Sequence, residues 1–123
     1  MTNLITNKGK NIILNRVFDG SVVYSEPSLF QAGTGTTGPS STDTVLETPL
    51  GSPAAFMSGY PIIDTLEPTV TIRALIDSAT FNGEALSEFG VTEVETDLFG
   101  RAVYIVIDKT TQIQVIYVER EVF

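Results

Sequence analysis

The chain has 123 residues, no Cys and no His, and a formal net charge of −8 from 15 acidic and 7 basic residues. These numbers indicate a single small domain, and they exclude disulfides, thiolate metal sites and the Ser-His-Asp and Cys-His relays. The negative charge disfavours nucleic acid and anionic membranes as partners. No signal peptide or long apolar run is present, so we expect a protein made in the cytoplasm. A non-catalytic domain without metal or cofactor is the resulting expectation.

The first predicted element is a helix over residues 6–18, which Thr6 or Asn7 can cap. Residues 1–20 are therefore expected to form an N-terminal helical segment, and residues 21–123 a single β-sandwich domain with a proline-rich excursion at 47–68. One face of the helix is apolar at helical spacing. This stripe either packs on the rest of the domain or docks on a neighbouring subunit, and it consists of Ile12, Ile13, Val17 and Phe18.

Residues 21–25 and 29–32 predict two short strands, and a long loop rich in Gly and Thr follows them. The small side chains at the start of this loop allow close backbone approach, so we expect them to lie where subunits meet. They are Gly33, Thr34, Gly35 and Thr36. The same glycines, with Gly38, match the letters of a dinucleotide-binding motif. That motif needs a helix directly after it, and Pro39 with a Ser/Thr run follows instead, which favours a turn.

Residues 47–68 carry four prolines, which cannot donate to a sheet ladder. Strands in this segment are therefore expected at sheet edges, and the segment is expected to reach outward. Phe56 and Tyr60 lie in it, where a strand would not easily bury them. We expect these two aromatic side chains to anchor an interface.

From residue 69 onward the pattern is that of strands separated by turns. Strands are predicted over residues 69–77, 86–94, 101–107 and 113–118. Residues 81–83 form a tight turn in which Asn82 and Gly83 accept positive φ, residues 95–100 form a loop, and Gly90 marks a bulge or close approach. The predicted fold is mainly β: an antiparallel β-sandwich with one N-terminal helix and a long Gly/Thr-rich loop.

Charged residues in the predicted strands allow several roles. Arg73, Arg101 and Arg120 could form inter-strand ion pairs or bridge subunits. Glu93, Glu95 and Asp97 share one face, which is either a solvated acidic surface or a site for a hard cation. Glu84 and Glu88 are spaced like a glycosidase pair, but any acidic sequence offers such pairs. We therefore assign no catalytic, metal-binding or cofactor-binding residue.

Several segments, in this order, resemble the N-terminal domains of tail-fibre and tail-collar-fibre proteins from tailed bacteriophages. The segments are LITNKGKN at residues 4–11, FQAGTGTTGPSSTDTVL at 30–46, VTIRA at 70–74, NG at 82–83, LSEFGV at 86–91 and RAV at 101–103. The resemblance implies an antiparallel β-sandwich that attaches fibres or other appendages to the particle. It supplies no catalytic residues.

Fibre proteins of this kind continue into a long shaft, whereas this chain stops at Phe123. We therefore expect a tail-side adaptor in the virion, at the baseplate, collar or fibre base. Its expected partners are other phage structural proteins and copies of itself, in a trimer or a ring of three- or sixfold symmetry. A capsid decoration protein is one alternative. A host-glycan-binding module is another, in which Tyr24, Phe56, Tyr60 and Tyr104 stack on sugars.

Deleting residues 1–18 is expected, on this view, to leave a folded β domain that fails to assemble.

Overall fold

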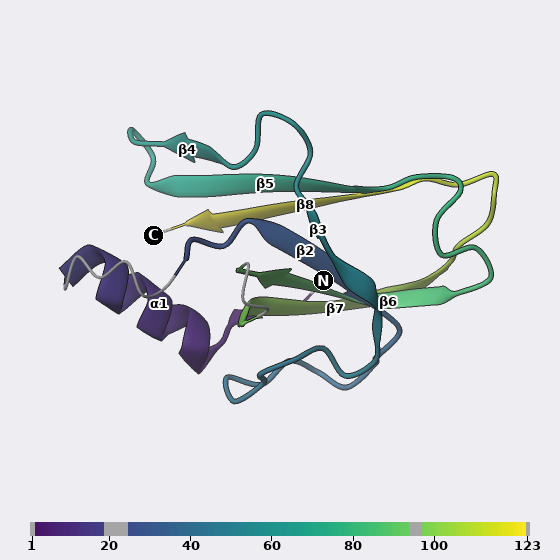
Figure 1. Cartoon of the computed structure of the whole chain (residues 1–123), viewed down its shortest axis with the longest axis horizontal. Helices are drawn as coiled ribbons and strands as arrows, with labels where there is room; N and C mark the ends of the chain where they lie inside the picture. Colours follow the sequence, from purple (N-terminus) through teal and green to yellow (C-terminus); the bar gives the residue numbers. More distant parts are fainter. Residues whose placement is uncertain (1, 19–24, 94–96, 123) are drawn as a thin grey trace.

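The computed structural model describes residues 2–18, 25–93 and 97–122, and it confirms the predicted β-sandwich with one N-terminal helix. Two antiparallel sheets pack together (Figure 1). The five-stranded sheet has the order β1-β7-β6-β2-β3 and the three-stranded sheet the order β4-β5-β8. The strands are β1 (Thr2–Ile5), β2 (Leu29–Gly33), β3 (Pro49–Ala55), β4 (Ile62–Asp64), β5 (Thr69–Ile76), β6 (Ala85–Thr92), β7 (Leu98–Asp108) and β8 (Val115–Val122). No helix in the described ranges is long and apolar enough to cross a membrane.

The helix α1 (Asn7–Phe18) begins where its sequence predicts, with Thr6 as the cap. The Thr6 hydroxyl accepts a hydrogen bond from the Gly9 amide at 3.0 Å and donates to the Leu98 carbonyl at 2.5 Å. An added Cβ at Gly9 would lie 2.2 Å from the Phe99 carbonyl oxygen, so glycine lets the helix lie directly on β7. The cap thus ties the helix to the sheet as well as starting it.

The strand β1 was not predicted. It pairs antiparallel with β7, from Thr2 opposite Val103 to Ile5 opposite Gly100. The N-terminal segment therefore supplies an edge strand of the larger sheet in addition to the helix. The strand predicted over residues 21–25 falls almost entirely outside the described residues.

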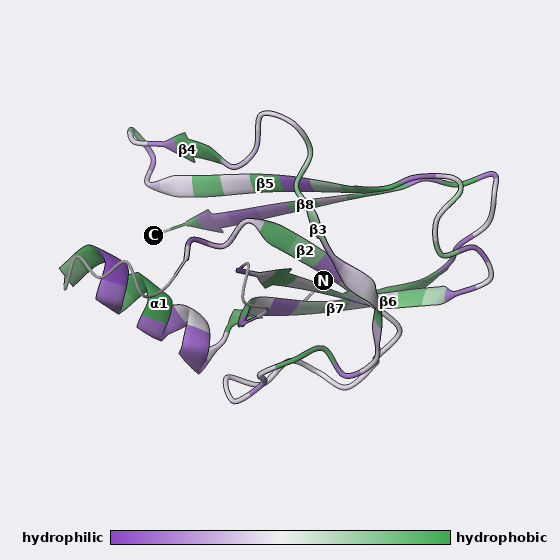
Figure 2. Ribbon diagram, in the orientation of Figure 1, coloured by the Kyte–Doolittle hydropathy of each residue, from purple (hydrophilic) through white to green (hydrophobic). Residues whose placement is uncertain are grey.

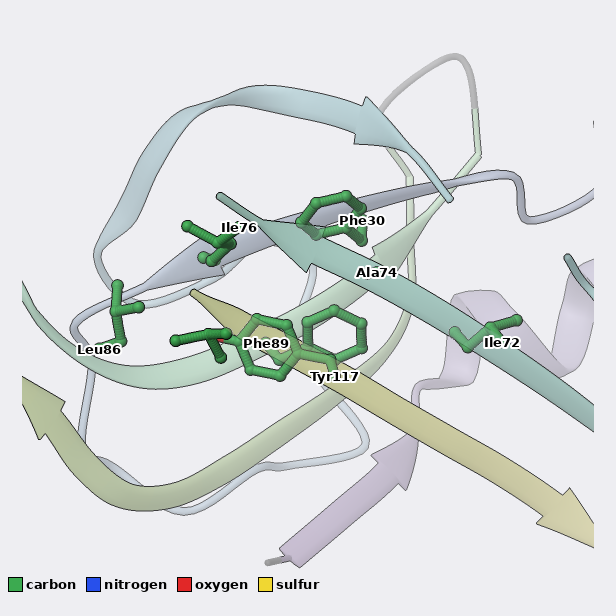
Figure 3. Close-up of a cluster of buried hydrophobic side chains, with 9 residues drawn as sticks. Phe30, Ile72, Ala74, Ile76, Leu86, Phe89 and Tyr117 are labelled. Atoms are coloured by element: carbon green, nitrogen blue, oxygen red, sulfur yellow. The ribbon is translucent and has the colours of Figure 1, made fainter. Parts of the chain in front are cut away.

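The core lies between the two sheets, where the inward faces of β5, β6 and β8 meet. Phe89 of β6 stacks on Tyr117 of β8 with ring centroids 4.4 Å apart. Figure 3 shows the two rings side by side. The predicted alternation along β5 is confirmed, because Ile72, Ala74 and Ile76 are buried while Arg73 and Leu75 are exposed. The full cluster is Phe30, Ala32, Ile72, Ala74, Ile76, Leu86, Phe89, Val115 and Tyr117.

The proline-rich segment forms sheet edges, as predicted. In the described sheets, β3 pairs only with β2 and β4 pairs only with β5, so neither strand has a second neighbour. Between them the chain crosses from the larger to the smaller sheet, where the Met57 amide donates to the Arg73 carbonyl at 2.8 Å. Edge positions tolerate the missing amide donors of Pro49 and Pro53.

Two local predictions were wrong. Phe99 and Gly100 belong to β7 rather than to a loop, because β7 must extend far enough to pair with β1. In the turn between β5 and β6, positive φ occurs at Phe81 (56°) and Gly83 (88°), whereas Asn82 has none. The Asn82 side chain instead accepts a hydrogen bond from the Lys109 ammonium at 2.9 Å, which joins two neighbouring turns.

Candidate assembly site

A buried carboxylate organises the long Gly/Thr loop. Glu88 of β6 is fully buried, and its Oε1 accepts hydrogen bonds from the Thr48 amide at 2.7 Å and the Gly35 amide at 3.1 Å. Its Oε2 accepts the Glu47 amide at 3.1 Å and the Arg101 Nε–H at 2.9 Å. One side chain therefore binds both ends of the loop and the neighbouring strand β7. Charge-assisted bonds of this kind are stronger than neutral ones.

Further contacts hold the middle of the loop. Arg101 reaches Asp43 with its Nη1 at 3.2 Å, and Asp43 also accepts the Ser40 amide at 2.8 Å. The Ser87 hydroxyl donates to the Gly35 carbonyl at 2.6 Å. These contacts hold the loop against β6 and β7, and Arg101 forms the predicted inter-strand ion pair, with Glu88 as its partner.

Gly33 and Gly35 of the loop lie close to Glu88, a residue of the same chain. An added Cβ at Gly33 would lie 2.3 Å from Glu88 Oε1, and one at Gly35 would lie 2.8 Å from the Glu88 carboxyl carbon. Gly33 and Gly35 are buried, whereas Thr34 is half-buried and Thr36 exposed. No helix follows these residues, which agrees with a turn rather than a dinucleotide site. Their role between subunits stays a prediction.

The apolar stripe of α1 divides into a buried and an exposed part. Ile12 is buried against the sheet, Ile13 is half-buried, Val17 is 67% exposed and Phe18 is 82% exposed. Ile12 therefore packs on the rest of the domain, which is one of the two predicted roles of the stripe. Val17 and Phe18 in the last turn leave an exposed apolar surface, and docking of this surface on a neighbouring subunit stays a prediction.

The turn after β4 adds to that surface. In Figure 1, α1, β4 and the end of β8 lie at the same end of the molecule, and Figure 2 shows apolar residues on both α1 and β4 there. Ile63 of β4 is 71% exposed and Leu66 in the following turn is 95% exposed. We name Val17, Phe18, Ile63 and Leu66 the apolar end.

Between α1 and the β4–β5 hairpin, the sandwich opens into a cavity of about 580 Å³. Its walls come from both sheets and the helix, and they are mostly apolar. Representative lining residues are Ile13, Val17, Phe56, Ile63, Val70 and Phe89. The apolar end forms the rim of this cavity through Val17 and Ile63.

The two aromatic residues expected as anchors are both partly covered. Phe56 packs against the core and lines the cavity. Tyr60 is half-buried, and the Arg73 guanidinium lies over its ring at 5.8 Å from the centroid. Tyr104 packs edge-on against Tyr117, with contact between the two hydroxyls, so it is not placed for stacking on a sugar. Tyr24 lies outside the described residues.

Acidic groups accompany the apolar walls. Along the inward face of β8, Val115 and Tyr117 lie in the core, while Glu119 and Glu121 line the cavity. Burial raises the pKa of Glu121 above its usual range, because apolar surroundings disfavour the charged form. The inward side of β8 thus changes from apolar to acidic where the sandwich opens.

In the acidic run before β7, Glu93 does not face solvent, whereas the Asp97 side chain is 42% exposed. Glu93 is buried, and its carboxylate accepts the Asp97 amide at 3.0 Å, while Glu95 lies outside the described residues. In the part of the chain that the structure describes, no three acidic side chains are close enough to hold a metal ion. Glu93 therefore closes a local turn.

Sequence reasoning did not identify the Glu88 cluster or the cavity. Glu88 lies within the strand predicted over residues 86–94, with Ser87 before it and Phe89 after it, which is a weak signal for a buried charge. Comparison of the chain with protein-family models, curated proteins and solved structures finds no match.

Proposed function

We propose that the chain is a structural protein of a tailed-bacteriophage virion, a tail-side adaptor that acts through protein–protein contact at the baseplate, collar or fibre base. It performs no catalysis. It is made in the host cytoplasm and then incorporated into the particle. The ordered sequence segments that resemble tail-fibre and tail-collar-fibre N-terminal domains support this proposal.

The observation that carries the proposal is the apolar end. The exposed side chains are Val17, Phe18, Ile63 and Leu66, on elements at one end of the molecule, and Val17 and Ile63 also line an apolar cavity. Exposed apolar side chains beside an apolar cavity favour an interaction site. The net charge of −8 keeps the free subunit soluble until that surface is covered.

The edge strands support assembly into a ring. In the described sheets, β3 and β8 each pair on one side only, and exposed edges must be covered to avoid uncontrolled pairing. Copies related by three- or sixfold symmetry would cover each other's edges. The clamped loop gives such an adaptor a rigid outer surface, since Glu88 binds both of its ends.

Quantitative mass spectrometry of purified particles, with heads and tails separated, tests this proposal. We expect a low copy number that follows the tail fraction. Hundreds of copies on heads would overturn the tail placement and indicate capsid decoration. Absence of the chain from purified particles would overturn the proposal altogether.

A further inference from the structure

We infer that a small pocket on the outer face of the larger sheet binds a tyrosine side chain of a partner protein. The pocket has a volume of about 190 Å³, and none of its described lining residues lines the larger cavity at the apolar end. The inference goes beyond the proposed function, which places assembly at the apolar end. We name this site the outer pocket, and its wall includes Val45, Leu46, Pro49, Pro53, Thr92 and Leu98.

The outer pocket lies on the side of the larger sheet that faces away from the core. Val91 of β6 lines the cavity between the sheets, while its neighbour Thr92 lines the outer pocket, because successive side chains of a strand point to opposite faces. The Gly/Thr loop crosses this outer face, where a Leu46 methyl carbon would lie 2.7 Å from a Cβ added at Gly90. The pocket is therefore formed where the loop meets the sheet.

The walls of the outer pocket accept one apolar ring. Leu46 and Leu98 are buried, whereas Val45 is 67% exposed, so the pocket is apolar and reaches the surface. None of its described lining residues is ionisable, and a charged ligand would find no counter-charge there. An apolar cavity of about 150 Å³ holds one benzene molecule. The volume of the outer pocket thus matches a single six-membered ring.

A buried hydroxyl in the wall adds a polar requirement. Thr92 is 3% exposed, and its Oγ1 has no hydrogen-bond partner among the described residues. Other buried hydroxyls of the chain are paired, for example those of Thr6 and Ser87, which donate to backbone carbonyls. A buried hydroxyl without a partner costs free energy, and a bound group that pairs with it recovers that loss.

A phenol ring matches both properties of the outer pocket. Its ring fits the apolar walls, and its hydroxyl can donate to or accept from Thr92 Oγ1. A sugar ring of similar size carries several hydroxyls, and apolar walls would leave most of them unpaired. Tyrosine presents a phenol at the end of a side chain and is enriched at protein interfaces for the same combination of an apolar body and a polar tip.

The described tyrosines of a second copy are not available as the occupant. The Arg73 guanidinium lies over the Tyr60 ring, 5.8 Å from its centroid. Tyr104 packs edge-on against Tyr117, and the two hydroxyls are in contact. The inferred occupant is therefore a tyrosine of another protein.

The experiment is a titration of the full chain with N-acetyl-tyrosinamide and N-acetyl-phenylalaninamide, followed by backbone amide chemical shifts in NMR spectra. We expect saturable shifts at Leu46, Thr92 and Leu98. The dissociation constant should be about fivefold lower for the tyrosine compound, because only its ring carries a hydroxyl for Thr92. Thr92→Val keeps the shape of the side chain and should make the two affinities equal.

The matched control is Thr111→Val, in an exposed turn outside the outer pocket, which should keep the fivefold difference. Thr92→Val also tests the free chain. Since it removes a hydroxyl without a partner, the melting temperature should stay the same or rise. A lower melting temperature would mean that the hydroxyl is already paired in the free chain, and the inference would be wrong.

Other outcomes also overturn the inference. These are the absence of saturable shifts at the outer pocket, equal affinities of the two compounds for the unmodified chain, and tighter binding of N-acetylglucosamine than of the tyrosine compound. Self-association of the chain that the tyrosine compound reverses would show that the occupant is a second copy. Every measurement uses the free chain, so the result does not depend on the virion role.

Discussion

Glu88 is the residue on which the long loop most depends. Its carboxylate accepts three backbone amides of the loop and the Arg101 guanidinium, and both side chains are almost completely buried. Ion pairs in such surroundings add little net stability when intact, but the loss of one partner leaves the other charge buried alone. The loop and the strand beneath it therefore depend on the same carboxylate.

We expect Glu88→Gln to lower the free energy of unfolding by about 3–5 kcal/mol, because Arg101 would remain buried without its counter-charge. Urea denaturation measures this. Glu84→Gln is the control, since Glu84 is exposed, and it should change stability by less than about 0.5 kcal/mol. A loss below about 1 kcal/mol for Glu88→Gln would mean that the loop does not depend on the Glu88 carboxylate.

The loop glycines provide a matched pair of substitutions. An added Cβ at Gly33 meets Glu88 Oε1 at 2.3 Å and the Thr48 carbonyl oxygen at 2.6 Å, whereas one at Gly38 meets nothing within 4 Å. We expect Gly33→Ala to cost about 2 kcal/mol through overpacking, and Gly38→Ala to be neutral or slightly stabilising. Thermal unfolding of the two variants checks this, and equal effects would mean that the loop relaxes away from Glu88.

Tyr104 links stability to alkaline pH. Its pKa is raised strongly above the ordinary value of 10.0 for tyrosine, first by burial and then by its hydrogen bond with the Tyr117 hydroxyl. The folded chain keeps this proton while the unfolded chain releases it above pH 10, so stability present below that pH is lost as pH rises. Tyr104→Phe should therefore flatten the decline of the urea midpoint between about pH 9 and about pH 11. An unchanged decline would show that Tyr104 ionises without unfolding.

At the scale of elements, α1 is part of the sandwich as well as a surface. The Thr6 hydroxyl caps α1 by accepting the Gly9 amide, and it joins the helix to β7 by donating to the Leu98 carbonyl. On the apolar stripe of the helix, Ile12 is buried while Val17 is exposed. The expectation that deletion of residues 1–18 leaves a folded domain does not fit this arrangement. That deletion removes β1 from the edge of the larger sheet and Ile12 from the interior.

Substitutions on the two parts of the stripe separate these roles. We expect Ile12→Ala to lower the free energy of unfolding by about 3 kcal/mol, because it leaves a cavity between helix and sheet. Val17→Ala should change it by less than about 0.5 kcal/mol, since Val17 contributes little buried area. Chemical denaturation followed by circular dichroism compares the two, and a tolerated Ile12→Ala would mean that the helix is not needed for the fold.

At the scale of the whole molecule, exposed apolar side chains of the described residues lie at several places. Phe18 ends α1 and Leu66 lies in the turn between β4 and β5, two elements at the same end of the molecule in Figure 1, whereas Ile105, which is 91% exposed, lies towards the far end of β7. The net charge of −8 offsets both in the free subunit. Only the first surface adjoins the cavity, and for that reason we place assembly there.

We expect the double variant F18D/L66D to keep the melting temperature of the unmodified chain but to be missing from particles when supplied in trans. The reason is that charge on an apolar contact surface opposes its desolvation without affecting the interior. Ile105→Asp is the control and should be incorporated normally. If Ile105→Asp blocks incorporation and F18D/L66D does not, the assembly surface lies at the other end. Immunoblots of purified particles give the readout.

The sequence by itself determined the elements whose signals are local. The cap and stripe of α1, the alternation along β5, the edge positions of the proline-rich strands and the close approach at Gly90 could be predicted. Each depends on backbone chemistry or side-chain periodicity within a few residues. At Gly90 the prediction is confirmed, since an added Cβ would lie 2.7 Å from a Leu46 methyl carbon.

Only the tertiary structure decided which distant residues meet. Glu88 and Thr48 are separated by 40 residues, and the pairing of β1 with β7 joins the start of the chain to residues 100–103. The cavity likewise combines side chains of α1, β4, β5 and β8. Such contacts follow from sheet order and from the helix position, which periodicity does not encode. The loop glycines show the difference: their sequence predicts close approach, but the structure supplies the partner, a carboxylate of the same chain.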